Sequence, residues 1–385
     1  MKVIRVFIFV FISLIFVSTL LFLAHFLYLK FDSKKIQPVA PKEKIERNKL
    51  KKIIGFLPFW SVAANVKVES GNFTDIYYFG LGIEQSGVIR QSGPEWEIFN
   101  SRYMKNLREE MKQSGTKFSV VIKDFDGDKM AKISSSSASL KQFISSLSLL
   151  IAQNDLDGIN FDFEYPAGSN FPTSEQLSNV IEEVVFGIRK NNPGVVLSFD
   201  ISGNIPEKER IYDVKKIGEL MDFIILMGYD YKTPTSSFAG PPAPLLGEIN
   251  EHTISESVAY LNSRVEVSKI VLGIPLYGYE WETHDATYKS SAVPKSGALA
   301  TIKRVQKLIL ENKNILKHWD DKAKSPWFSY KDGGVVKEIY YEDTNSIKSK
   351  IEFAQENYLF GIAFWALGYE GQDSGILNLV RQIAF

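Results

Sequence analysis

The side chains best suited to chemistry lie in one short apolar and acidic run, LDGINFDFEYP, at residues 156–166. In an extended strand, alternate side chains share a face, so Asn160, Asp162 and Glu164 lie together at a spacing of roughly 6.5–7 Å between neighbours. Burying two carboxyl groups is costly unless they have partners or a function. A carboxylate pair of this kind suits general acid–base catalysis, in which one group donates the proton and the other is its charged neighbour.

The elements that must position this pair follow from the hydrophobic pattern. From residue 53 onward, helical patterns alternate with eight runs rich in β-branched and aromatic residues, at 53–60, 75–81, 118–122, 158–164, 195–201, 223–227, 270–274 and 361–366. Continuous apolar strands separated by helices indicate a parallel sheet covered on both faces. Eight such units predict an α/β fold, the (β/α)₈ TIM barrel, with the acids pointing inward at its carboxyl end.

The segment between strands 4 and 5 shows the helical pattern clearly. Apolar residues recur from 177 to 188 at the spacing of one helix face. Thr173 and Gln176 stand where a capping box would begin this helix, and Asn191, Asn192 and Pro193 would end it.

The connection between strands 7 and 8 is too long for a single helix. It contains a helical stretch at 299–312 and two strand-like pieces, PWFSY and KEIYY, on either side of an Asp-Gly-Gly turn. We therefore expect a small α+β insertion at about 283–342 that forms one wall of a cleft at the carboxyl end of the barrel.

Five motifs resemble one known family. DGINFDFE at 157–164 resembles the DGxDxDxE signature of family 18 glycoside hydrolases, the chitinase family. GFLPFW at 55–60, MGYD at 227–230, LGIPLYG at 272–278 and FWALG at 364–368 resemble that family's first, sixth, seventh and eighth strands. The resemblance covers nearly all of 53–385, including the insertion, and implies a glycosidase.

The resemblance implies a role for each matching residue. Glu164 would be the general acid and then the base, Asp162 would hydrogen-bond the substrate's 2-acetamido group, and Tyr229 would hold the carbonyl oxygen of that group. Trp365 would form the floor beneath the sugar, with Met227 beside it. The implied mechanism is retaining and substrate-assisted, through an oxazolinium ion. A negative Asp162 would help Glu164 to keep its proton near neutral pH.

Three further residues complete the expected substrate site. Asn160 stands where the family pattern has a middle carboxylate; its amide can hydrogen-bond Asp162 but cannot carry charge. Asp230 could orient a substrate hydroxyl or cap the next helix. Trp60 could stack on a sugar at an outer subsite, as could Trp281 and Trp327, although a single tryptophan is more often part of the packing.

Two features of the sequence bear on the substrate. The third strand reads FSVVIKDFD without the SxGG of many chitinases, so that the roles of Lys123 and Asp124 cannot be transferred. This third strand, together with the WALGYE and SPWFSYKDGGVVKEIYYED stretches, makes the sequence resemble the bacterial branch of the family that includes spore-cortex and peptidoglycan N-acetylglucosaminidases. We expect Asp343 of the latter stretch to cap a helix and to lie outside the site.

Three functions are therefore open. The preferred substrate is N-acetylglucosamine in peptidoglycan or its fragments, with chitin or chito-oligosaccharides as the alternative. A third possibility of another class is a tethered, non-catalytic lectin, because barrels of this family that lose the acid become sugar binders. The presence of Glu164, Asp162 and Tyr229 favours an enzyme, which we expect to be a monomer.

The N-terminal region predicts a membrane anchor. Residues 6–29 form an apolar run of 24 residues, long enough to cross a bilayer and longer than the core of a cleavable signal peptide. No A-x-A cleavage pattern follows it, although secretion after cleavage is the alternative. Residues 30–52 are lysine-rich and read as a tether of roughly 25–30 Å. We expect a single-pass bacterial membrane protein with its catalytic domain, residues 53–385, outside the cytoplasm.

Composition excludes several other classes. The 385 residues include no cysteine, which rules out disulfides, thiolate metal sites and a cysteine nucleophile, and the four histidines are unpaired in the sequence. Residues 1–52 carry 11 Lys/Arg and 3 Asp/Glu, so the net charge is +8 there and −8 over 53–385. Because residues 53–385 carry a net negative charge, they would repel the phosphates of a nucleic acid, and the sequence argues against a nucleic-acid partner. We expect neither a metal nor another cofactor.

Overall fold

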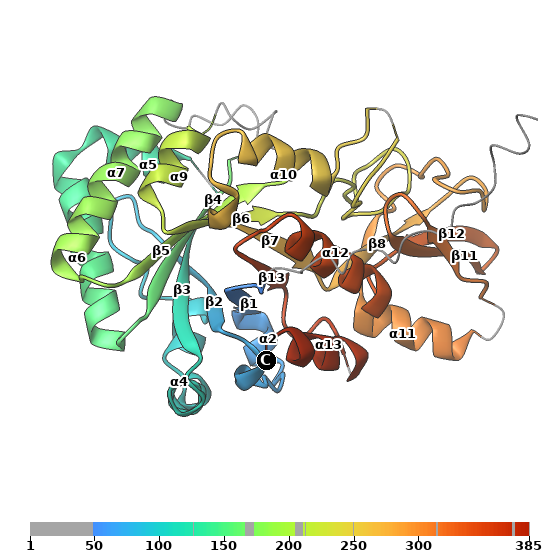
Figure 1. Cartoon of the computed structure of the whole chain (residues 1–385), viewed down its shortest axis with the longest axis horizontal. Helices are drawn as coiled ribbons and strands as arrows, with labels where there is room; N and C mark the ends of the chain where they lie inside the picture. The colour runs from blue at the N-terminus through green and yellow to red at the C-terminus, as the bar shows by residue number, and fades with distance from the viewer. Residues whose placement is uncertain are drawn as a thin grey trace, which may run out of the picture. The chain divides into compact units, whose positions relative to one another are not determined.

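Eight parallel strands close into a barrel in the order β1-β13-β7-β6-β5-β4-β3-β2 (Figure 1). The computed structural model describes residues 49–125, 127–165, 173–204, 211, 213–248, 250–312, 315–371 and 374–384. The strands are β1 (Lys52–Pro58), β2 (Asp75–Gly82), β3 (Lys117–Asp124), β4 (Gly158–Phe163), β5 (Val196–Ser202), β6 (Phe223–Met227), β7 (Ile270–Pro275) and β13 (Gly361–Trp365). The predicted eight-stranded barrel is confirmed.

Helices follow the barrel strands and pack around them (Figure 1). They are α2 (Phe59–Ala63), α3 (Pro94–Phe99), α4 (Arg102–Ser114), α5 (Asp128–Ser135), α6 (Ser137–Asn154), α7 (Ser174–Asn191), α9 (Val214–Leu220), α10 (Ile254–Asn262), α12 (Thr344–Glu356) and α13 (Ser374–Ala384), with short 3₁₀ turns at Ser70–Asn72 and Val267–Lys269. The capping box predicted at Thr173 is confirmed, since the Thr173 hydroxyl and the Gln176 side chain accept each other's backbone N–H.

The barrel strands separate two hydrophobic cores. The outer core lies between strands and helices and contains the buried face of α7 together with Phe161 and Phe163 of β4. The inner core fills the barrel, with Ile54, Phe56, Tyr77, Phe79, Val121, Phe223, Ile225, Val271 and Ala363. This division follows from the period of two along each strand. It leaves the inward positions near the carboxyl ends for polar groups.

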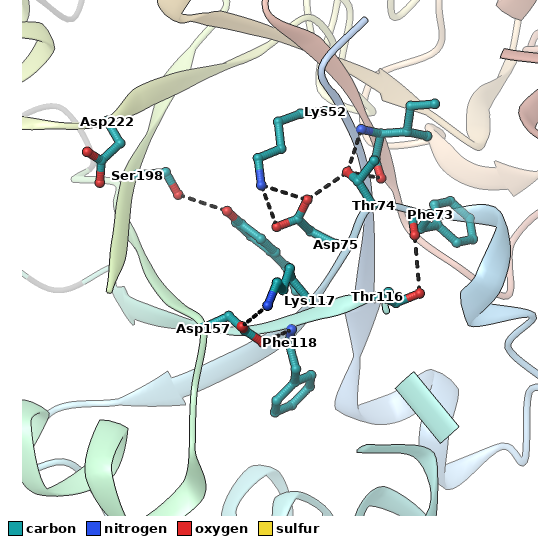
Figure 2. A network of polar contacts seen from close by, with 12 residues as sticks. Lys52, Phe73, Thr74, Asp75, Thr116, Lys117, Phe118, Asp157, Ser198 and Asp222 are labelled. Atoms are coloured by element: carbon teal, nitrogen blue, oxygen red, sulfur yellow. Dashed lines mark hydrogen bonds and ion pairs between the residues drawn. The ribbon is translucent and has the colours of Figure 1, made fainter. Parts of the chain in front are cut away.

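An ion pair lies at the amino end of the barrel. Lys52 Nζ contacts the two carboxylate oxygens of Asp75 at 2.8 and 2.9 Å, and Figure 2 shows this pair inside the ring of strands. Nearby, Lys117 pairs with Asp157 at 2.9 Å. These charged residues begin or precede their strands, so they lie at the end of the barrel opposite Glu164.

The insertion between β7 and β13 is a second, antiparallel sheet of five strands in the order β10-β11-β12-β8-β9. Its elements are β8 (Tyr277–Glu282), β9 (Ala298–Thr301), α11 (Ile302–Glu311), β10 (His318–Asp320), β11 (Ser325–Asp332) and β12 (Val335–Tyr340). The predicted hairpin is β11 and β12, and Gly333 and Gly334 of its turn have positive φ of 57° and 88°. The sheet includes residues 277–282, which precede the predicted start of the insertion because β8 follows β7 after a single residue.

Asp343 caps α12, as predicted, by accepting from the backbone N–H groups of Asn345 and Ser346. The predicted anchor at 1–29 and most of the predicted linker lie outside the described residues, and Lys52 of that linker begins β1. Within the described ranges, no helix is both long enough and apolar enough to cross a bilayer.

Candidate active site

A cleft of about 540 Å³ lies where the barrel strands end. It is lined by residues that follow or end β1, β2, β3, β4, β5, β6 and β13. Seven of the eight predicted site residues line it: Trp60, Asp162, Glu164, Met227, Tyr229, Asp230 and Trp365. The cleft also includes Phe79, Lys123, Phe125, Ser202, Asn204 and Thr233. The carboxyl end of the barrel thus brings together residues more than 300 positions apart in the sequence.

Strand β4 aims two carboxyl groups into this cleft. Phe161 and Phe163 alternate with the acids and pack in the outer core, where their rings lie 5.6 Å apart. Asp162 is deeply placed, with only 4% of its surface exposed, whereas Glu164 is half-buried. The backbone N–H of Glu164 donates to the carbonyl of Asp124 at 3.0 Å. Glu164 therefore lies nearer the mouth of the cleft, where a ligand can reach it.

Tyr229 provides a hydroxyl on the neighbouring wall, just beyond β6. Burial raises the pKa of Tyr229 well above its ordinary value, and the negative charges of Asp200, Asp230, Asp162 and Glu164 raise it further. The hydroxyl therefore keeps its proton and can donate a hydrogen bond to a ligand oxygen. Met227, which ends β6, is half-buried in the same wall.

Aromatic rings form an apolar floor around Trp365. Its ring centroid lies 4.6 Å from that of Phe79, 5.7 Å from Phe56 and 6.1 Å from Trp60, in edge-to-face arrangements. The indole N–H of Trp60 donates to the Tyr369 hydroxyl at 3.1 Å, which fixes the Trp60 ring. A rigid aromatic surface of this kind suits the apolar face of a sugar ring.

Asp230 joins the barrel to the insertion. Its Oδ1 accepts from the hydroxyls of Tyr277 and Tyr279 at 2.6 and 2.7 Å, and both tyrosines belong to β8. The prediction that Asp230 caps the next helix is wrong, because Thr253 caps α10 by accepting from Glu256 N–H. Asp230 instead holds the insertion sheet against the cleft wall, beside Tyr229.

Asn160 does not line the cleft, which corrects the prediction that it contacts substrate. Its side chain is completely buried, two residues before Asp162 on the same face of β4 and hence one layer deeper in the barrel. The amide nitrogen donates to Ser198 Oγ at 3.0 Å and to Asp200 Oδ1 at 2.9 Å, both on β5. Asn160 therefore supports the cleft from below.

Lys123 is a cleft residue to which the family resemblance assigns no role. It is the penultimate residue of β3 and is paired in register with Asp162 of β4. Its ammonium lies 5.1 and 5.4 Å from the ring centroids of Phe79 and Phe59. Burial lowers the pKa of Lys123, while the charges of Glu95 and Asp162 oppose that shift. The period of two that marks Asp162 and Glu164 as inward could have identified Lys123 as inward as well.

Asp124, the neighbour of Lys123, points away from the cleft. It forms an ion pair with Lys129 at 3.5 Å and accepts from the Tyr165 hydroxyl at 3.3 Å. The two unassigned residues of β3 therefore differ in role, because successive side chains point to opposite faces of the sheet.

The suggestion that Trp281 and Trp327 stack on sugars is wrong. Trp281 has no exposed surface, and its indole N–H donates to the Thr233 carbonyl at 3.3 Å. Trp327 is buried between His318 and Tyr340, with ring centroids 4.5 and 5.7 Å away. Both tryptophans belong to the hydrophobic core of the insertion.

The cleft provides groups for acid–base chemistry on a ligand with an apolar face. It offers a half-buried carboxyl group, a deeper carboxyl group, a protonated tyrosine hydroxyl and an aromatic floor. In the part of the chain that the structure describes, no three His, Asp or Glu side chains are grouped as a metal site.

The sequence is similar to that of known glycosidases. The sequence model of Glycosyl hydrolases family 18 matches residues 52–370. The "Uncharacterized glycosylase YvbX" of Bacillus subtilis (strain 168) is 25% identical over 306 residues, which cover 78% of this chain and 81% of that protein. The "Cortical fragment-lytic enzyme" of the same strain is 25% identical over 225 residues, 57% of this chain and 48% of that protein.

The fold is also found among solved structures. The crystal structure of an Ostrinia furnacalis Group IV chitinase matches with a TM-score of 0.77 and 19% identity, over 87% of this chain and 99% of that one. At this identity the match shows the fold alone.

Proposed function

The chain belongs to glycosyl hydrolase family 18, and from this premise we propose that it is a retaining glycosidase that cleaves peptidoglycan or its fragments after β-linked N-acetylglucosamine. One observation carries the proposal: Asp162, Glu164 and Tyr229 meet over the aromatic floor of Trp365 in a single cleft. The arrangement provides a proton donor, a charged neighbour, a hydroxyl donor and an apolar platform for one pyranose ring.

The proposed first step breaks the glycosidic bond without a covalent enzyme intermediate. Glu164 gives its proton to the glycosidic oxygen as the bond from that oxygen to the anomeric carbon breaks. The acetamido oxygen of the same sugar attacks the anomeric carbon, so that an oxazolinium ion forms. Water then adds to the anomeric carbon, passes a proton to the Glu164 carboxylate and opens the ring. Two inversions leave the anomeric configuration retained.

Asp162 and Tyr229 assist this step through the acetamido group. A carboxylate at Asp162 accepts from the amide N–H and stabilises the positive charge that develops on the oxazolinium ring. The Tyr229 hydroxyl donates to the acetamido oxygen and aligns it with the anomeric carbon. Because the nucleophile belongs to the substrate, only sugars that carry a 2-acetamido group react.

A cation in the cleft favours peptidoglycan over chitin. Chitin is uncharged, whereas the N-acetylmuramic acid of peptidoglycan has a lactyl group whose carboxylate is free wherever no stem peptide is attached, and the stem peptides carry carboxylates of their own. Lys123 lies beside Asp162 on the adjacent strand, and its ammonium can bind such a carboxylate. The relative named as a cortical fragment-lytic enzyme supports the same choice, and the chitinases among the relatives support chito-oligosaccharides as the alternative.

Product analysis tests the substrate. Mass spectrometry of digests of purified peptidoglycan and of colloidal chitin would distinguish the three possibilities. Muropeptides cleaved after N-acetylglucosamine are the expected products. Activity confined to chitin would replace the proposed substrate with the alternative, and sugar binding without any released product would indicate a lectin.

We also propose that residues 6–29 anchor the protein in a bacterial membrane, with the catalytic domain outside the cytoplasm on the tether at 30–52. This proposal is supported by the length of the apolar run. Cell fractionation with N-terminal sequencing tests it. An intact N-terminus in the membrane fraction is expected, and a shortened chain in the medium would indicate a cleaved signal peptide.

A further inference from the structure

A layer of polar side chains lies directly beneath the cleft, inside the barrel. Asp200 of β5 lies at the upper edge of this layer and has 4% of its surface exposed. Its Oδ1 accepts from the Asn160 amide at 2.9 Å, and the same amide donates to Ser198 Oγ at 3.0 Å. On the far side, the Tyr77 hydroxyl is 3.4 Å from Ser198 Oγ.

The register of the strands sets the height of Asp200. Asn160 of β4 is paired with Ser198 of β5. Asp200 is two residues beyond Ser198, and Asp162 is two residues beyond Asn160, so the two carboxyl groups point inward at one level on adjacent strands. Asp200 is therefore a buried acid beside the catalytic strand, and unlike Asp162 it is not among the residues that line the cleft.

The charge state of Asp200 is coupled to the cleft. Burial raises the pKa of Asp200 well above its ordinary value; the hydrogen bond from Asn160 opposes this shift, and the charge of Glu164 adds to it. The other titratable groups that face it are Asp162 on β4, Tyr229 beyond β6 and Tyr77 on β2. Burial, with a contribution from the Asp200 charge, raises the pKa of Tyr77 and of Tyr229, so both stay neutral.

We propose that Asp200 is a positioning residue for the glycosidase reaction, acting through Asn160 and through its charge on Glu164 so that the two carboxyl groups together retain one proton near neutral pH. This inference rests on the proposed function. Two interacting acids lose their protons in two separate steps, and the charge left by the first loss opposes the second. The shared proton is then available on Glu164 when a glycosidic oxygen accepts from it.

The arrangement also explains how the amide at position 160 is accommodated. Asn160 cannot titrate, so strand β4 provides no acid in the layer beneath the cleft. Strand β5 provides one at Asp200, in direct hydrogen-bond contact with that amide. The carboxyl group that contacts position 160 therefore comes from β5 and not from β4.

Three variants and their pH profiles test the inference, with a chromogenic di-N-acetylchitobioside as substrate. Asp200→Asn removes the second titrating carboxyl group of the pair and preserves the shape, so the alkaline limb of kcat/KM is expected to move to lower pH by about one unit. The exchange variant N160D/D200N returns an acid to the layer and is expected to restore the wild-type limb. Ser198→Ala removes a hydrogen bond to Asn160 without changing charge and should leave the limb in place.

Different results contradict different claims. A wild-type limb in Asp200→Asn, or an exchange variant that behaves like Asp200→Asn, would overturn the role of Asp200. A lack of hydrolysis by the wild-type protein would overturn the proposed function and this inference with it. If Asp200→Asn does not fold by circular dichroism, Asp200→Ser keeps an acceptor for Asn160 and is expected to show the same shift.

Discussion

Replacing Lys123 with methionine tests whether the cleft selects a sugar that carries a carboxylate. Methionine keeps the apolar stem that packs near the rings of Phe59 and Phe79 and removes only the ammonium. The side chain lies in the cleft, on the strand adjacent to Asp162. The substitution should therefore leave the catalytic groups in place and change only the recognition of charge.

The size of the effect follows from the strength of a charged hydrogen bond. Such a bond contributes about 1.5–3 kcal/mol. Its loss should lower kcat/KM by about 10- to 150-fold for a fragment whose N-acetylmuramic acid has a free lactyl carboxylate. A chito-oligosaccharide of the same length has no carboxylate, so its kcat/KM should change little.

The assay compares both substrates with wild-type protein, Lys123→Met and a control. Lys132→Met is a suitable control, because Lys132 is exposed and its ammonium contacts Gln85 outside the cleft. Mass spectrometry of the products gives the two rates in parallel. An equal loss on both substrates, or no loss on the muropeptide, would refute the assignment of Lys123 to carboxylate binding.

Three further predictions concern the cleft and the insertion. Tyr229→Phe removes the hydroxyl that orients the acetamido oxygen and should lower kcat by about 10²-fold; an unchanged kcat would exclude that contact. Trp365→Ala removes the floor, so steady-state kinetics should show a loss of at least about tenfold in kcat/KM, whereas Trp365→Phe should recover part of it. Burial raises the pKa of Glu338 from 4.5 to about 7. Between these two pH values the folded protein keeps a proton that the unfolded chain loses. The free energy of unfolding therefore falls as pH rises through this range, by up to about 3 kcal/mol. Glu338→Gln should flatten that dependence of Tm in calorimetry between pH 5 and 7, and an unchanged slope would contradict it.

Most of the fold follows from local patterns in the sequence. Each barrel strand is a compact apolar run, and the helix after β4 carries its own start signal at Thr173. The hairpin of the insertion is signalled by Gly333 and Gly334 between two alternating runs. The extent of the insertion sheet cannot be read from local sequence, because β8 pairs with β9 and with β12, and β12 lies about 60 residues later in the chain.

Site residues were predictable from the sequence where the alternation along a strand decides whether a side chain points into the barrel. Asp162 and Glu164 alternate with phenylalanines, and the loops after barrel strands converge, which brings in Tyr229 and Trp365. The depth of Asn160 depends on how β4 and β5 align, and its contact with Asp200 joins residues 40 positions apart. Trp281 and Trp327 have the same residue type as Trp365, and only the packing of the insertion separates them from the cleft.

The most direct test of the central claim, that Glu164 donates the proton to the leaving group, is the rate of hydrolysis of a chromogenic di-N-acetylchitobioside. Glu164→Gln should retain the fold and lower kcat by about 10²- to 10⁴-fold. Glu175→Gln, an exposed residue in the first turn of α7, is the matched control and should behave like the wild type. Comparable rates for wild-type protein and Glu164→Gln would contradict the account.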